Sequence, residues 1–194
     1  MTRQGELPSL DPRKDAVSVS ICGVGGQGVV LAGVVLGQAA INTGLWACQS
    51  AAYTVAARGG FARSEAILAP VAQACPLAED VDVIIGLAAE GWRSDRSRLR
   101  RTGWALCDEG VAGTAAAAGT VVTVPFERIA AECGQPRSVN LVALGVLNGV
   151  FGLVPAEEML AAADEHLGQR PGNAAALQAG TEAGIRLRDS WEKR

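Results

Sequence analysis

Lysine and histidine are almost missing from this sequence. Among its 194 residues there are two lysines, Lys14 and Lys193, and one histidine, His166. A phosphate-binding P-loop needs a lysine directly after its glycines, and Schiff-base catalysis needs a lysine in the folded body, so both are excluded. A histidine-activated serine or cysteine would have to use His166, which lies in a polar helical stretch. We therefore expect no catalytic residue on this chain.

The cysteines are few and lie far apart. They are Cys22, Cys48, Cys75, Cys107 and Cys133, and no C-x-x-C pair occurs. Zinc sites and iron–sulfur clusters use closely spaced cysteines, so neither is indicated. Each cysteine lies among apolar residues, which is typical of small buried side chains. We expect no metal and no cofactor bound by this chain on its own.

Excess charge and long apolar runs are also absent. The 17 basic and 20 acidic residues leave a net charge of −3, which gives no basic surface for nucleic acid. No apolar run reaches the length of a membrane span, and residues 1–15 lack the apolar core of a leader. We expect a cytoplasmic protein that binds neither nucleic acid nor membranes. Because 49% of the residues are hydrophobic, some of them are expected at subunit interfaces, including a homodimer when the chain is isolated.

Short apolar segments alternate with longer helical ones. Strands are expected at 17–23, 45–48, 62–69, 81–87, 104–107 and 120–124, and helices at 29–43, 90–101, 126–133, 138–152, 156–167 and 174–191. This alternation predicts an α/β fold, a three-layer α/β/α arrangement with a mostly parallel sheet, a Rossmann-like start and a helical C-terminal third. We expect a flexible tail over 1–15 and one domain over 16–194.

A glycine-rich turn follows the first strand and precedes the first helix. It comprises Gly23, Gly25, Gly26, Gln27 and Gly28, in the order G-x-G-x-x-G that is typical of dinucleotide binding. That function also needs a carboxylate about 20 residues later for the ribose. No Asp or Glu occurs between Asp15 and Glu65. Three interpretations stay open: an NAD(P) site, a turn needed only for packing, and a site for another anion or a partner loop.

A second group of residues follows the second strand, where Tyr53 precedes Arg58, Gly59 and Gly60. Loops that leave the carboxyl ends of parallel strands gather at one edge of the sheet, so this loop is expected to face the glycine turn. An arginine beside two glycines and opposite a helix N-terminus would make an anion cradle. A surface arginine after a flexible turn is the simpler explanation.

Taken together, these motifs resemble the gamma subunit of the 2-oxoacid:ferredoxin oxidoreductases, the pyruvate, 2-oxoglutarate and ketoisovalerate type. The resemblance covers residues 17–185 and includes the G-V-G-G-Q-G turn, the R-G-G loop and the run that contains Asn140. It implies a complex that oxidatively decarboxylates a 2-oxoacid with coenzyme A and reduces ferredoxin. Thiamine diphosphate and [4Fe–4S] clusters would lie on the alpha, beta and delta subunits, which would be the partners of this chain.

The resemblance assigns this chain a structural and interface role, in which it helps to form the coenzyme A or thiamine end of the assembled site. The glycine turn and the R-G-G loop are the expected contacts, with Tyr53 and Asn140 as secondary candidates. Asn140 also suits a helix cap. Thr54 and Ala56 stand where the family has glycine and glutamate, so no ion pair is carried over to Arg58. A stand-alone NAD(P)-binding oxidoreductase and a non-enzymatic anion sensor remain the alternatives.

Overall fold

A computed structural model describes residues 7–54, 60–73, 77–111 and 117–193 of the chain. Within these residues one six-stranded sheet has the order β2-β3-β1-β4-β5-β6. The strands are β1 (Val17–Val24), β2 (Trp46–Tyr53), β3 (Phe61–Ala69), β4 (Val81–Gly86), β5 (Leu99–Asp108) and β6 (Thr120–Val124). All strands except β3 run in the same direction, which confirms the mostly parallel sheet.

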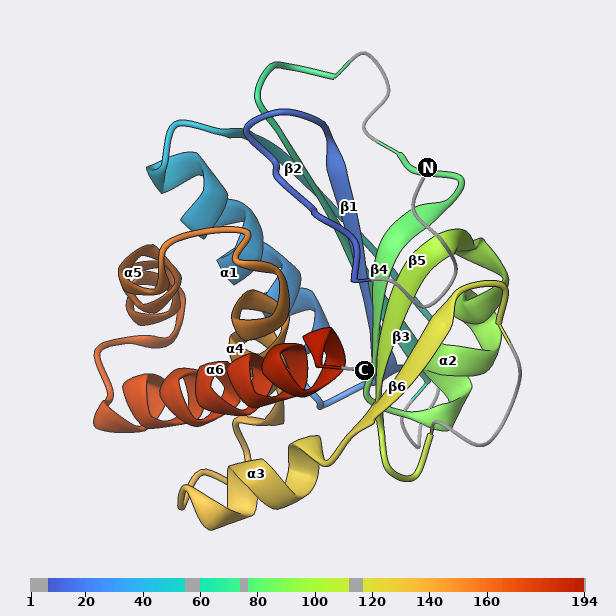
Figure 1. The fold of residues 1–194 in the computed structure, drawn as a ribbon. Coiled ribbons are helices and arrows are strands. Elements are labelled where there is room, and N and C mark those ends of the chain that lie inside the picture. Colours follow the sequence, from blue (N-terminus) through green and yellow to red (C-terminus); the bar gives the residue numbers. More distant parts are fainter. Residues whose placement is uncertain (1–6, 55–59, 74–76, 112–116, 194) are drawn as a thin grey trace.

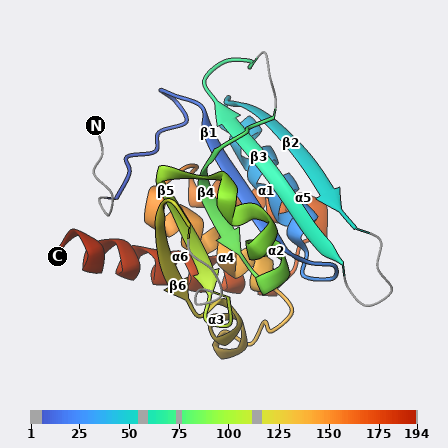
Figure 2. The ribbon, with the colours of Figure 1, turned by 90° about the vertical axis from the view of Figure 1, so that its right-hand side faces the viewer.

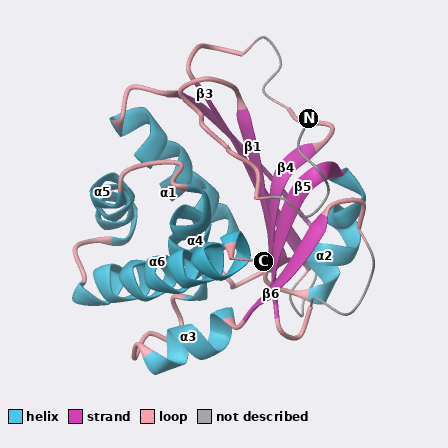
Figure 3. Cartoon of the chain, in the orientation of Figure 1, coloured by secondary structure: helices cyan, strands magenta, loops and turns pink. Residues whose placement is uncertain are grey.

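Helices lie on both faces of this sheet, as expected for three layers (Figures 1 and 3). The described helices are α1 (Val29–Asn42), α2 (Ala89–Asp95), α3 (Phe126–Glu132), α4 (Val139–Phe151), α5 (Ala156–Leu167) and α6 (Pro171–Glu192), with a 3-10 turn η1 (Arg96–Arg98). One face carries α1, α4, α5 and α6, while α2 lies on the other (Figure 2). Within the described residues, no helix is both long and apolar enough to cross a membrane.

The helical layer is built around α4, in which every residue from Asn140 to Val150 is buried. A helix that is apolar on all sides is expected in such a central position. It packs most closely against α6, where Gly145 and Gly149 face Gly180 and Gly184. A Cβ atom on Gly149 would come within 3.0 Å of the Gly184 Cα. The glycines therefore let the two helix backbones meet without side chains between them.

Two boundaries differ from the sequence-based expectation. Residues 49–53, expected in a loop, extend β2 and pair with β3 as far as Tyr53 and Ala62. Residues 99–101, expected at the end of a helix, begin β5 instead, and α2 already ends at Asp95. In both places pairing with a neighbouring strand of the sheet overrides the local pattern. The arginines of residues 93–101 therefore do not share one helix.

The segment before β1 contacts the domain in its described part. Leu7 and Leu10 are partly buried and pack against the hydrophobic core, and Pro12 is buried. Lys14 and Asp11 form an ion pair across the turn at 3.3 Å. The boundary between tail and domain stays a prediction.

Candidate functional site

The glycine turn joins β1 to α1 as the sequence predicts. Gly26 and Gly28 have φ angles of 91° and 70°, in the left-handed region that favours glycine. Gly28 is the N-cap of α1, and no side chain caps this helix. The N–H groups of the first turn of a helix have no partner within the helix, so they present a partial positive charge here.

Gln27 closes the turn over the end of the sheet. Its Oε1 accepts a hydrogen bond from the Val24 backbone N–H at 2.9 Å, and its Nε2 donates to the Leu87 carbonyl oxygen at 3.2 Å. The side chain thereby ties the turn to the segment that follows β4. Gln27 therefore fixes the conformation of the turn, and it lies outside the cavity described below.

The second predicted motif meets the glycine turn through Gly60. The Gly25 backbone N–H donates to the Gly60 carbonyl oxygen at 2.9 Å. This contact follows from the sheet, because Val24 at the end of β1 pairs with Phe61 at the start of β3. Arg58 and Gly59 lie outside the described residues.

A cavity of about 550 Å³ lies between the two motifs. It is lined by Val24, Gly25, Gly26, Gly28, Val29, Val30, Leu31, Tyr53, Thr54, Gly60, Phe61 and Ala62. Tyr53 is 69% exposed and Val30 is 37% exposed, so an aromatic and an aliphatic side chain stand open to solvent beside it. None of the described lining residues carries a charge. We refer to this feature as the glycine-turn cavity.

Asn140 of α4 contacts the end of the glycine turn. Its side chain is 6% exposed, and its Nδ2 donates to the Gly28 carbonyl oxygen at 3.3 Å. Ser138 is the N-cap of α4, and no side chain makes a capping bond there. The prediction that Asn140 caps its helix is therefore wrong. Its side chain instead joins α4 to the glycine turn. Of the predicted residues, Gly25, Gly26, Gly28, Tyr53 and Gly60 line the cavity, while Gly23 packs under Gln27.

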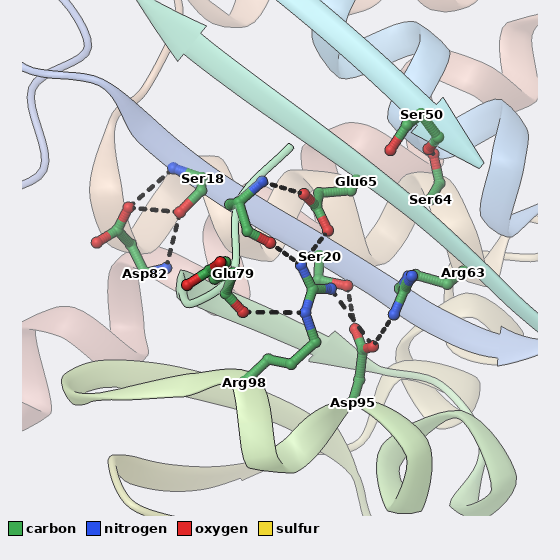
Figure 4. Close-up of polar contacts among 11 residues, drawn as sticks. Ser18, Ser20, Ser50, Arg63, Ser64, Glu65, Glu79, Asp82, Asp95 and Arg98 are labelled. Carbon is green, nitrogen blue, oxygen red and sulfur yellow. Dashed lines mark hydrogen bonds and ion pairs between the residues drawn. The ribbon is translucent and has the colours of Figure 1, made fainter. Parts of the chain in front are cut away.

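A buried ionic cluster on the opposite face was not predicted from the sequence (Figure 4). Asp95 is fully buried and accepts hydrogen bonds from Ser20 Oγ and from Arg63 Nη1, the latter at 2.9 Å. Arg98 pairs with Glu65 at 2.6 Å and lies 3.6 Å from Asp95. The Arg98 side chain is only 19% exposed, so it lies largely inside this cluster. The cluster fixes α2 to the sheet.

Two cysteines are buried beside this cluster. Burial, followed by the nearby Asp95 carboxylate and Cys107, raises the pKa of Cys22 well above its usual value of 9.0. Burial also raises the pKa of Cys107 to about 12. Both side chains stay neutral thiols in the folded chain at physiological pH. Among the described residues, no group of three His, Cys, Asp or Glu side chains is placed to hold a metal ion.

The strand order argues against a dinucleotide site of the usual type. In a Rossmann fold the second parallel strand lies beside the first and carries the ribose-binding carboxylate at its end. Here β3 lies beside β1 and runs antiparallel to it, and β2 ends in Tyr53. The first acidic residue of this region, Glu65, is 4% exposed and paired with Arg98. No described carboxylate lines the glycine-turn cavity.

Comparisons with known proteins identify similar chains. A family model described as "Pyruvate ferredoxin/flavodoxin oxidoreductase" matches residues 18–183. The 2-oxoglutarate synthase subunit KorC of Methanocaldococcus jannaschii is 32% identical over 73% of this chain and 78% of its own length. The KorC subunit of Methanothermobacter thermautotrophicus is 30% identical over 89% of this chain and 96% of its own length. The gamma subunit of a keto/oxoacid ferredoxin oxidoreductase from Geobacter sulfurreducens superposes with a TM-score of 0.74 at 27% identity, covering 88% of this chain and 99% of that one.

Proposed function

Because this chain belongs to the pyruvate ferredoxin/flavodoxin oxidoreductase family as a gamma-type subunit, we propose that its glycine-turn cavity completes the active site of an assembled 2-oxoacid:ferredoxin oxidoreductase. Such a complex converts a 2-oxoacid, coenzyme A and two oxidised ferredoxins into an acyl-CoA, CO2 and two reduced ferredoxins. The alpha, beta and delta subunits are the proposed partners, in the cytoplasm. Thiamine diphosphate and [4Fe–4S] clusters on those partners would supply the decarboxylation and electron-transfer chemistry.

The chemistry of the glycine-turn cavity supports a contact with an anionic group. The first turn of α1 lines the cavity and has no side-chain cap, so its N–H groups are available to an anion. No described carboxylate lines the cavity to repel one. A phosphate of coenzyme A fits these donors. Tyr53 and Val30 would contact the apolar part of the same ligand or of a neighbouring subunit.

The single observation that carries this proposal is the bond between the Gly25 N–H and the Gly60 carbonyl oxygen, at 2.9 Å. It joins two glycine motifs that are separated in the sequence into one wall of one cavity. The described residues of the two motifs lie outside the buried ionic cluster that holds α2.

The proposal is tested by replacing Val30 in the complete complex with Glu and, as a matched control, with Gln. A carboxylate at this position is favourable for the helix itself, because Val30 lies in the first turn of α1. It repels an anion in the cavity. We expect Val30→Glu to raise the KM for coenzyme A about tenfold or more, a free-energy change of about 1.4 kcal/mol. Val30→Gln is expected to leave it within about twofold, and neither variant should change the KM for the 2-oxoacid.

The controls separate the open alternatives. Equal coenzyme A kinetics for Val30→Glu and Val30→Gln would show that no anion binds in the cavity. A chain that binds no alpha and beta subunits but binds NAD(P) would support the stand-alone oxidoreductase. A chain that binds neither, but binds inorganic phosphate in a Val30-dependent way, would support the sensor. Thiamine-dependent decarboxylation by the isolated chain would contradict the division of labour between subunits.

A further inference from the structure

The helical layer contains a second cavity, of about 280 Å³, between α4, α5 and α6. It is lined by Gly145, Asn148, Ala156, Glu157, Met159, Leu160, Ala174, Leu177, Gln178, Thr181 and Glu182. Its walls are largely apolar, with Met159 and Leu177 nearly buried. It shares no lining residue with the glycine-turn cavity. The volume suits one or two large apolar side chains.

The packing of α5 explains why this space is open. α5 lies on the outside of the helical layer and packs chiefly against α1 (Figure 1). α6 packs chiefly against α4, through the glycine contacts described above. The short side chains of Ala156 and Ala174 leave the gap between α5 and α6 unfilled. An apolar cavity that opens to water gains stability when another apolar side chain fills it.

The surface beside this cavity is acidic. α5 contains Glu157, Glu158, Asp164 and Glu165 and no lysine or arginine. Its outer face, with Leu160 and Ala161 between three of these carboxylates, borders a shallow cavity of about 500 Å³. The two cavities share Glu157 and Leu160, so they lie next to each other along α5, and we refer to them together as the α5–α6 groove. Glu182 on α6 lies on the other side, where it pairs with Arg186 at 4.0 Å and accepts a hydrogen bond from Gln178 Nε2 at 3.1 Å.

Some of these charges also have roles inside the chain. Glu157 lies in the first turn of α5, where a carboxylate stabilises the helix dipole. Asp164 accepts a hydrogen bond from Asn173 Nδ2 at 2.8 Å. Glu165 is exposed and makes no ion pair with a described residue. The acidic character of the groove therefore exceeds what the folding of α5 requires.

We propose that this α5–α6 groove docks a basic amphipathic helix of a partner subunit. Apolar side chains of that helix would fill the cavity beside Leu160 and Leu177, and its lysines or arginines would face Glu157 and Glu165. This is the usual way in which a groove between helices binds a helical segment, and the charges select the partner and its orientation. The inference rests on the proposed function in one respect, since it requires a complex with partner subunits.

Cross-linking in the assembled complex tests the position of the partner. The photoreactive residue p-benzoylphenylalanine replaces Ala161, which is exposed in the groove, or Val30 in the glycine-turn cavity. We expect Ala161 to cross-link to a partner segment with apolar residues at helical spacing and at least two flanking lysines or arginines. A cross-link from Val30 but none from Ala161 would overturn the docking inference and leave the proposed function standing. A chain that elutes alone, without cross-links from either position, would overturn both.

Charge reversal tests the chemistry of the same contact. In Glu157→Lys/Glu165→Lys the affinity for the partner subunits should fall at least tenfold in low salt, and the difference should shrink at high salt. The control is Glu127→Lys/Glu132→Lys on α3, whose affinity should match the wild type because both glutamates lie exposed outside the groove. Ala156→Trp, which fills the cavity without changing charge, should also weaken binding. An unchanged affinity in Glu157→Lys/Glu165→Lys and in Ala156→Trp, or a cross-linked segment without basic residues, would overturn the inference.

Discussion

The Asn140 side chain donates a hydrogen bond to the Gly28 carbonyl oxygen across 112 positions of the chain. This bond ties the buried helix α4 to the end of the glycine turn. A Cβ atom on Gly28 would lie 2.5 Å from Asn140 Nδ2, so the two residues also fit each other sterically. The position of the cavity wall therefore depends on a residue that lies outside the glycine motif.

Asn140→Ala should lower the free energy of unfolding by about 1 kcal/mol, because it removes one largely buried hydrogen bond. Gly28→Ala should cost more, since the new Cβ meets Asn140 and Gly28 has a φ of 70°. In the double variant the steric conflict disappears, so its loss should be smaller than the sum of the single losses. Urea denaturation of the wild type, the two single variants and the double variant measures these losses in the free energy of unfolding. Strictly additive losses would show that the two residues do not interact.

Local motifs explain which parts of the site could be predicted from the sequence. The G-V-G-G-Q-G turn lies between β1 and α1. Two of its residues, Gly26 and Gly28, have positive φ angles, which favour glycine, so the turn leaves a recognisable glycine pattern in the sequence. The contact between Gly25 and Gly60 was also predictable, because β1 and β2 end at the same edge of the sheet. Both inferences depend on chain order and strand direction alone.

Long-range packing explains what could not be predicted. Residues 49–53 have little local strand pattern and become a strand by pairing with β3. Arg98 lies in an arginine-rich stretch typical of a solvated face, yet it pairs with Glu65 from a strand 33 positions earlier. The role of Asn140 was hidden for the same reason, since its acceptor belongs to a distant turn. In each case the partner is set by the three-dimensional fold.

The buried ionic cluster predicts that losing the Asp95 carboxylate costs far more stability than losing the exposed Glu109 carboxylate. Asp95→Ala would remove the buried carboxylate that pairs with Arg63, while Arg98 would keep Glu65; breaking a buried ion pair in this way typically costs about 3–5 kcal/mol. The control is Glu109→Ala, which breaks an exposed pair with Arg128 at 3.3 Å and should cost about 1 kcal/mol or less. Chemical denaturation of both variants gives the comparison. Similar small losses would mean that the cluster does not hold α2 to the sheet.

The contact between α4 and α6 predicts that glycine at position 180 is essential for packing. In Gly180→Ala the added Cβ would overlap the Val142 carbonyl oxygen, so the helices must move apart at a cost of about 1–3 kcal/mol. In Gly110→Ala, the matched control, the Cβ meets nothing within 4 Å and stability should change little. The melting temperatures of the two variants measure the difference. A stable Gly180→Ala protein would show that α4 and α6 can separate freely.

The buried thiols predict a loss of stability in alkaline solution. Burial raises the pKa of Cys107 from 9.0 to about 12, and burial also raises the pKa of Cys22. The folded chain therefore retains thiol protons that the unfolded chain releases above about pH 9. The contribution of these thiols to the free energy of unfolding is fully present below that pH and falls as the pH rises toward 12, by about 1.4 kcal/mol per pH unit for each thiol.

Urea midpoints at pH 7, 9 and 10 test this loss of stability, with Cys107→Ala as the comparison. The Cys107→Ala slope above pH 9 should be about half that of the wild type, because only Cys22 still contributes. Equal slopes would show that Cys107 ionises as readily in the folded chain as in the unfolded one.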